Sequence, residues 1–340
     1  MGRAAAARKL AAAAAFGGGG LSVMGASLYG LLRLEATIAR RVIGKAEGEP
    51  PDATGWYGAG RPGPAFRIAL LGDSSAAGYG VETVLQTPGA HLASGVAAAT
   101  DRRVYLQSVA FVGAQTRDLD AQIDKVLPNR PHVVVILVGV NDITHPRWPQ
   151  ESVRLLAAGV QRLREAGAEV VVGTCPDLGT LKPVAPPLKQ VARAWSRRLA
   201  AAQTITVVEA GGRSVSLASV LGPEFAALPQ VLFGPDGFHP SAAGYAALAS
   251  VLLPSVLSAL GVAPEEDQRL EPRRGEAVLP VSRAAVEAAG HPGTEVGATE
   301  VRGADRGARG RWAQLRRRRR RPRPEVEPPA EVEQTEPADA

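Results

Sequence analysis

Residues 133–138 form a continuous apolar run, Val-Val-Val-Ile-Leu-Val, with no alternation of polar and apolar side chains. Strands of this composition are covered on both faces, and they occur in parallel sheets flanked by helices. Further strands are expected where shorter apolar runs occur, at 66–71, 104–110, 169–173 and 204–208. Between them lie stretches with helical periodicity, so the sequence predicts an α/β fold with a parallel sheet and helices on both faces.

The helices expected between and after these strands cover residues 87–100, 116–126, 149–166, 187–202 and 241–260. The first is marked by Thr87 followed by Pro88, because threonine is a common N-cap and proline suits the first helical position. Together with the strands, these helices place one compact domain at residues 66–262. An apolar share of 45% among 340 residues suits a domain with a sizeable core.

The first 65 residues differ from this domain. Residues 10–32 carry no charge and are flanked by basic residues on both sides, which is long enough for a membrane-spanning helix. We favour a membrane anchor over residues 1–45, with a signal peptide and a helix packed against the domain as alternatives. We therefore expect the protein to be membrane-anchored; secretion and a cytoplasmic location are the alternatives. Residues 46–65 are rich in Gly and Pro and are expected to form a linker.

Residues 263–340 are dominated by charged residues, Gly and Pro, and we expect this tail to be disordered. Its arginine block at 316–321 could bind anionic lipid or nucleic acid, or could simply be solvated. No folded nucleic-acid-binding module accompanies it, and an aromatic share of 4% argues against a surface that stacks single-stranded bases. The net charge of +6 does not identify a partner. We expect a monomer.

A serine follows the first predicted strand, in the motif Gly72-Asp73-Ser74. Ser74 therefore lies at the carboxyl edge of the sheet, where ligands bind in open α/β folds. A Gly-Asp-Ser triplet alone is also a common turn or helix cap. It is not the G-x-S-x-G motif of the α/β-hydrolases.

An aspartate and a histidine stand three residues apart in Asp236-Gly237-Phe238-His239-Pro240. At this spacing one turn can bring the carboxylate to one imidazole nitrogen and leave the other nitrogen facing Ser74. A surface histidine beside a capping aspartate is the alternative. The other four histidines are weaker candidates for a base, although His145 could contact substrate; they are His91, His132, His145 and His291.

Asn141 lies in the motif Gly139-Val140-Asn141-Asp142, directly after the most apolar strand. Its amide could donate to the oxyanion of a tetrahedral intermediate, together with the backbone N–H groups of Ser74 and Gly113. Asp142 is expected to act as a turn or cap residue. No cluster of His, Cys, Asp and Glu has the spacing of a metal site, and the single cysteine, Cys175, excludes an internal disulfide.

The ordered set of motifs resembles the SGNH hydrolases, also called GDSL-type esterases and lipases, over residues 66–260. The resemblance implies a three-layer α/β/α fold of flavodoxin-like type and hydrolysis of acyl esters through a covalent acyl-serine, with no cofactor. By this resemblance Ser74 is the nucleophile, Gly113 and Asn141 complete the oxyanion hole, and Asp236 with His239 completes the triad. Two positions depart from the family pattern: Ser108 replaces an asparagine, and Ser75 replaces the leucine of the family name.

Three functions compete at this point. A serine esterase acting on small-molecule acyl esters is favoured. The alternatives are an acyltransferase or deacetylase acting on cell-envelope glycans, and a non-catalytic, membrane-tethered binding module. Specificity is expected to depend on the loops at 144–150 and 176–187, whose sequences identify no acyl chain or alcohol; Trp148 could line a pocket or pack on the surface.

Overall fold

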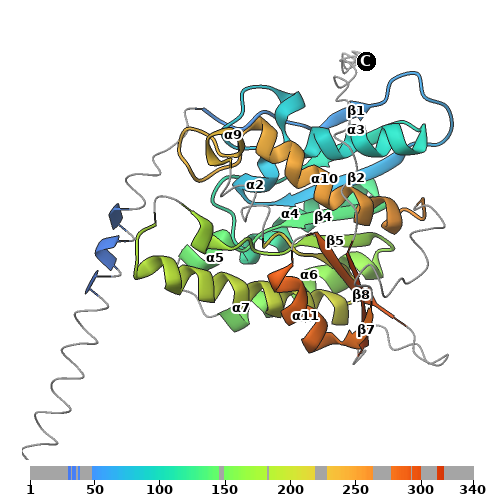
Figure 1. Ribbon diagram of the computed structural model, residues 1–340. Helices are drawn as coiled ribbons and strands as arrows, with labels where there is room; N and C mark the ends of the chain where they lie inside the picture. The colour runs from blue at the N-terminus through green and yellow to red at the C-terminus, as the bar shows by residue number, and fades with distance from the viewer. Residues whose placement is uncertain are drawn as a thin grey trace, which may run out of the picture.

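The computed structural model describes residues 30–31, 33–35, 37–38, 48–144, 149–181, 184–218, 228–262, 277–291, 293–299 and 312–317. A mixed sheet of nine strands forms the middle layer, and helices cover both of its faces (Figure 1). The three-layer α/β/α fold expected from the sequence is therefore confirmed. The expected membrane segment at 10–32 lies outside the described residues, apart from positions 30 and 31.

Five strands run parallel in the centre of the sheet. In spatial order they are β3 (Val104–Ser108), β2 (Phe66–Gly72), β4 (Val133–Leu137), β5 (Glu169–Gly173) and β6 (Arg213–Val215). Counted along the chain, these five have the order 2-1-3-4-5, which is the flavodoxin-like arrangement. The register pairs Gly72 with Leu137 and Leu137 with Gly173, so the carboxyl ends of β2, β4 and β5 meet at one edge.

Alternate side chains of each central strand enter two different cores. Val133 and Val135 of β4 pack with α3 (Pro88–Thr100) and α10 (Ala242–Ala259) on one face. Val134 and Ile136 pack on the other face with helices α4, α6 and α7. These helices are α4 (Leu119–Val126), α6 (Pro149–Glu165) and α7 (Leu188–Glu209). Because both faces are covered, the strand needs the continuous apolar sequence that it has.

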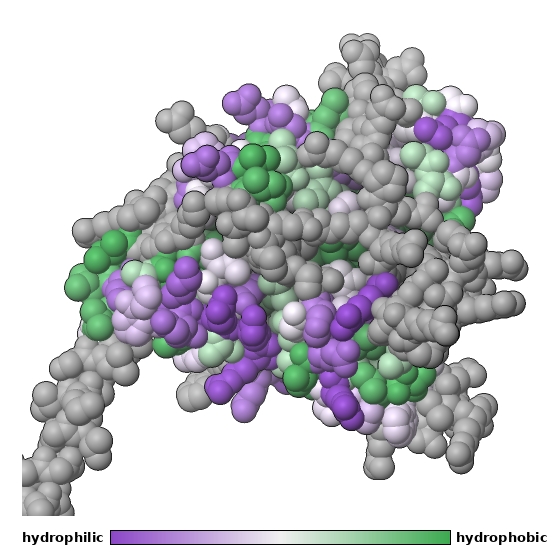
Figure 2. Space-filling model, viewed as in Figure 1, coloured by the Kyte–Doolittle hydropathy of each residue, from purple (hydrophilic) through white to green (hydrophobic). Residues whose placement is uncertain are grey.

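Helix α3 begins as expected, with Thr87 as N-cap accepting a hydrogen bond from the Ala90 N–H and with Pro88 at the first position. Helix α10 is similarly capped by Ser241. Among the described helices, α10 alone is long and apolar enough to cross a bilayer, but 72% of it is buried inside the domain. Figure 2 shows mainly hydrophilic side chains over the outer side of α7, where Arg193, Arg197 and Arg198 are exposed.

The strand predicted at 204–208 is wrong, because these residues continue helix α7 to Glu209. Their β-branched composition favours a strand, but the buried positions recur with helical spacing: Leu199, Gln203 and Thr204, then Val207 and Val208. Packing of this face outweighs the weak local preference of β-branched residues. The fifth parallel strand is instead the three-residue β6.

The linker expected at 46–65 contains a strand. β1 (Gly55–Tyr57) pairs antiparallel with β3 at one edge of the sheet. Tyr57 is buried, and its hydroxyl donates to the Ala53 carbonyl at 2.8 Å. This part of the chain therefore belongs to the domain.

The prediction of a disordered tail over 263–340 is wrong for its described parts. β8 (Thr294–Ala298) pairs antiparallel with β6, and β9 (Trp312–Arg317) and β7 (Ala277–Pro280) continue the sheet outward. Helix α11 (Val281–Gly290) covers these strands and packs against α7 through small residues such as Ala284 and Ala288. The small apolar residues on one face of α11 indicate a helix only weakly, because many charged residues surround them in the sequence. The overall composition therefore predicted disorder.

Candidate active site

A sharp turn joins β2 to the short helix α2 (Ser74–Ala77). Gly72 ends the strand with φ +138°, and a Cβ there would stand 1.9 Å from the Leu137 carbonyl oxygen. Asp73 caps the helix by accepting a hydrogen bond from the Ser75 N–H. Ser74 is the first residue of α2, so its backbone N–H is one of those that have no partner within the helix.

The structure brings Ser74, His239 and Asp236 together, although Ser74 and His239 are 165 residues apart in the chain. The Ser74 Oγ lies 2.9 Å from His239 Nε2. On the other side of the ring, His239 Nδ1 lies 2.6 Å from Asp236 Oδ2. The second oxygen, Oδ1, accepts hydrogen bonds from the backbone N–H groups of Phe238 and His239. Both carboxylate oxygens therefore hold the histidine loop in one shape.

Two aromatic rings and one hydroxyl fix the position of the imidazole. Tyr79 and Phe238 each meet the His239 ring edge to face, with ring centroids 4.9 Å apart. The buried Tyr245 of α10 donates its hydroxyl to the Tyr79 carbonyl at 2.8 Å. Because Tyr79 follows α2 closely, this bond joins the helix after the histidine to the turn that carries Ser74.

The two aspartates of the site have shifted pKa values in opposite directions. Burial acts to raise the pKa of Asp236, but the hydrogen bonds from His239 and Phe238 outweigh it and hold that pKa below its ordinary value. Burial raises the pKa of Asp73 to about 6, against the opposing effect of the hydrogen bond from the Ser75 N–H. Asp236 is therefore the carboxylate suited to stabilise an imidazolium.

Asn141 lies in the short helix α5 (Val140–Thr144), directly after β4. Its Nδ2 donates to the Ala114 carbonyl at 3.0 Å, which joins it to the loop that carries Gly113. Gly113 adopts φ +85° in that loop. Asn141 thus lies next to the Gly113 loop, and the Phe111 N–H donates to the Gly72 carbonyl at 3.3 Å, which brings the same loop against the end of β2.

Asp142 does more than cap a turn. It is buried and accepts hydrogen bonds from the N–H and hydroxyl groups of Thr116 and from the Ser152 hydroxyl. These bonds anchor the Gly113 loop at its far end. At the start of the loop, the N–H of Ser108, which stands where the family pattern has asparagine, donates to the Thr54 hydroxyl at 3.2 Å.

A model of the GDSL-like lipase/acylhydrolase family matches residues 70–247, which include the serine, asparagine and histidine motifs. The chain belongs to this family. It is 40% identical over 253 residues to the GDSL-like esterase Rv1075c of Mycobacterium tuberculosis, an alignment that covers 71% of this chain and 80% of that protein. As a member of the family, the protein is a carboxylic-ester hydrolase.

Solved structures with a similar fold include TesA, with 22% identity, a TM-score of 0.46, and coverage of 57% of this chain and 99% of TesA. Another is Axe2, an acetylxylan esterase from Geobacillus stearothermophilus, with 19% identity and a TM-score of 0.44. That comparison covers 60% of this chain and 99% of Axe2.

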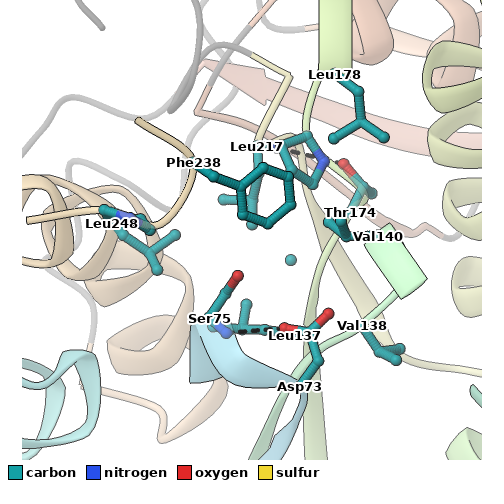
Figure 3. Close-up of a pocket in the computed structure, with 13 residues that line it drawn as sticks. Asp73, Ser75, Leu137, Val138, Val140, Thr174, Leu178, Leu217, Phe238 and Leu248 are labelled. Carbon is teal, nitrogen blue, oxygen red and sulfur yellow. Dashed lines mark hydrogen bonds between the residues drawn. The ribbon is translucent and has the colours of Figure 1, made fainter. Parts of the chain in front are cut away.

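A small cavity of about 50 Å³ lies beside the turn that carries Ser74 (Figure 3). Most of its wall is apolar, with Leu137, Leu217, Phe238 and Leu248 among the lining side chains. Within the described parts of the chain, no group of three or more His, Cys, Asp or Glu side chains is arranged to hold a metal ion. His145 and Trp148 lie outside the described residues.

Sequence reasoning missed two buried glutamines that hold the site together. Gln122 of α4 bonds the backbone of Gly72, and Gln203 of α7 bridges the Val138 carbonyl and the Cys175 N–H. Each glutamine lies beside apolar residues on the inner face of its helix. A polar residue at such a position is the signal by which the sequence could have revealed these two residues.

Proposed function

We propose that Ser74, His239 and Asp236 are the catalytic triad of this ester hydrolase and that it cleaves small-molecule acyl esters through a covalent acyl-serine. The observation that carries the proposal is the hydrogen-bonded chain from Ser74 Oγ through His239 to Asp236, with distances of 2.9 Å and 2.6 Å. A nucleophile, a base and a carboxylate in this order are the groups that activate a serine hydroxyl.

In the first step, Ser74 Oγ attacks the acyl carbon while His239 Nε2 takes the hydroxyl proton. Asp236 accepts a hydrogen bond from Nδ1–H, which keeps Nε2 unprotonated before the attack and stabilises the imidazolium after it. The tetrahedral intermediate then collapses as His239 returns the proton to the leaving alcohol oxygen. The products of this step are the free alcohol and the acyl-serine.

Water completes the cycle. His239 removes a proton from a water molecule as the water oxygen attacks the acyl carbon, and the second intermediate releases the carboxylic acid as the proton passes to Ser74 Oγ. Deacylation therefore follows the same path as the first step in reverse, with water in place of the alcohol.

The oxyanion of both intermediates is assigned to donors from three segments: the Ser74 N–H, the Gly113 N–H and the Asn141 amide. The bond from Asn141 to the Ala114 carbonyl supports this assignment, because it orients the amide and joins it to the Gly113 loop. Preorganised donors of this kind stabilise the developing charge, and losing one costs about 3 kcal/mol in the transition state.

Labelling with a fluorophosphonate tests the assignment of the nucleophile. The wild-type protein should be labelled at Ser74, and Ser74→Ala should abolish both labelling and hydrolysis of p-nitrophenyl acetate. Ser258→Ala, at the far end of α10, is the matched control and should behave as wild type. Labelling that persists in Ser74→Ala would show that another residue is the nucleophile.

A further inference from the structure

The cavity beside the nucleophile is formed by the neighbours of the residues assigned to catalysis. Asp73 and Ser75 flank Ser74, Phe238 and Pro240 flank His239, and Val140 precedes Asn141; all five line the cavity. The space therefore lies directly behind the point where the three catalytic segments meet. Because the acyl carbon of a bound ester must come within reach of the Ser74 Oγ, a group attached to that carbon can extend into this space.

The residues that line the cavity differ in burial. Ser75 and Phe238, next to the nucleophile and the base, are half-buried, whereas Leu137, Leu217 and Leu248 are fully buried. Figure 3 shows the Ser75 hydroxyl pointing into the space from α2, opposite the Phe238 ring. A group that entered from the catalytic side would pass Ser75 and end against the leucines.

The volume limits what can enter. A volume of about 50 Å³ is several times the roughly 10–15 Å³ that one water molecule requires by the same measure. It therefore accommodates about three to five water-sized groups. That is the size of an acyl tail of a few carbon atoms, and it is too small for a long fatty acyl chain.

The residue at position 75 controls this volume. The family is named for a leucine directly after the nucleophilic serine, and here that position is Ser75. A leucine side chain at the same Cβ would extend into the space that the serine hydroxyl borders. The short side chain of Ser75 thus leaves room for the acyl group beside Ser74.

The carboxyl group of Asp73 in the cavity wall disfavours acyl groups that carry a negative charge. Asp73 lines the cavity and is 1% exposed, and its Oδ1 accepts a hydrogen bond from the Ser75 N–H. The titratable groups that act on it are His239 and Asp142. When Asp73 is ionised, a carboxylate on the acyl chain would meet a like charge in an apolar surrounding, which is strongly unfavourable.

We propose that this cavity binds the acyl group of the substrate, that the group is short and uncharged, and that Ser75 is the residue that sets its length. The proposal rests on the proposed function of Ser74. It concerns the acyl side of the ester and not the alcohol.

A chain-length series with matched variants tests the pocket. kcat/KM is measured for p-nitrophenyl acetate, butyrate, hexanoate and octanoate with wild type, Ser75→Ala and Ser75→Leu. In wild type, octanoate should be about tenfold or more below butyrate. Ser75→Leu should lower the butyrate-to-acetate ratio by about tenfold or more, whereas Ser75→Ala, which keeps the space open, should retain the wild-type ratio.

Two further measurements separate the acyl pocket from other readings. Leu217→Ala enlarges the cavity at its apolar end and should raise the ratio of kcat/KM for hexanoate to that for butyrate. This variant tests the pocket even where Ser75→Leu does not fold. In wild type, the p-nitrophenyl hemisuccinate should be cleaved about tenfold or more slowly than the butyrate. Acetate esters of alcohols of increasing size should show no change of preference in Ser75→Leu.

The outcomes distinguish this proposal from the proposed function. If wild type is labelled at Ser74 but neither Ser75→Leu nor Leu217→Ala changes the acyl-length ratios, the cavity is not the acyl pocket. A change confined to the alcohol series would overturn it too. If Ser74 is not labelled and Ser74→Ala hydrolyses esters like wild type, the triad itself is wrong.

Discussion

Gln122 holds both polar groups of the Gly72 backbone: its Oε1 accepts from the Gly72 N–H at 2.8 Å, and its Nε2 donates to the Gly72 carbonyl at 3.0 Å. Gln122 is buried in α4, and Gly72 lies two residues before Ser74. The glutamine therefore fixes the last peptide of β2 from which the Ser74 turn begins.

Gln122→Met should lower the free energy of unfolding by about 1–3 kcal/mol, because it leaves the buried Gly72 N–H without this partner, whereas the Gly72 carbonyl keeps its bond from the Phe111 N–H. It should also lower kcat, since the turn that carries Ser74 loses its support. Urea unfolding and steady-state kinetics check both effects. Gln190→Met, at an exposed position of α7, is the control. Equal effects of the two substitutions would contradict the role of Gln122 in supporting the Gly72 backbone.

Asp236→Asn should reduce kcat by about 10⁴-fold, because the amide no longer stabilises the imidazolium and favours the wrong tautomer of His239. KM should change little, since Asp236 is not assigned a contact with substrate. Hydrolysis of p-nitrophenyl acetate measures both constants. Asp124→Asn, which removes an exposed carboxylate paired with Arg162, should retain the wild-type kcat. A loss of less than tenfold in Asp236→Asn would argue against the triad.

Gly72→Ala should cost more than about 4 kcal/mol of stability, because the new Cβ would stand 1.9 Å from the Leu137 carbonyl oxygen. Gly113→Ala is the matched comparison. Its φ of +85° is also unfavourable for alanine, but no atom lies within 4 Å of the new Cβ, so the cost should be only about 1–2 kcal/mol. Thermal unfolding of both variants measures the difference, and similar melting temperatures would contradict the close approach of β2 and β4.

Asp73 should make stability depend on pH. Its pKa is raised from 3.8 to about 6 in the folded protein, so between these values the folded state binds a proton that the unfolded state has released. The contribution of Asp73 to stability is therefore greatest below pH 4 and falls as pH rises through 6, by about 3 kcal/mol at 1.36 kcal/mol per pKa unit. Asp73→Asn removes this dependence.

Urea unfolding of wild type and Asp73→Asn at pH 4, 5, 6 and 7 measures the effect. The free energy of unfolding of the variant minus that of wild type should become more positive by about 2.4 kcal/mol between pH 4 and 7, because part of the full effect already lies below pH 4. Parallel pH curves for the two proteins would show that burial does not raise the pKa of Asp73.

The centre of the fold could be predicted from the sequence because two independent signals agree there. The apolar run at 133–138 requires cover on both faces, and the helical patterns on either side supply it. The signals disagree at 204–208, where β-branched residues favour a strand and buried spacing favours a helix; the packing of α7 decided the outcome.

The parts of the site that could be anticipated are those with a distinctive local sequence, such as Asp236 and His239 in a single turn. The supporting residues have no such signature. Gln122 and Tyr245 act on backbone groups of distant segments, and their partners become known only when the chain is folded. The same holds for Glu295 of β8, which is buried in the region expected to be disordered and pairs with Arg213 of β6.

The distance of 165 residues between Ser74 and His239 has a consequence for how activity arises. The chain forms all five parallel strands, from β2 to β6, before it reaches the loop that carries His239. Contacts between such remote segments form slowly, because loop closure is entropically costly. Catalytic activity therefore reports the assembly of the five parallel strands, and chains in which these strands are only partly assembled are expected to be inactive even where their helices are native-like.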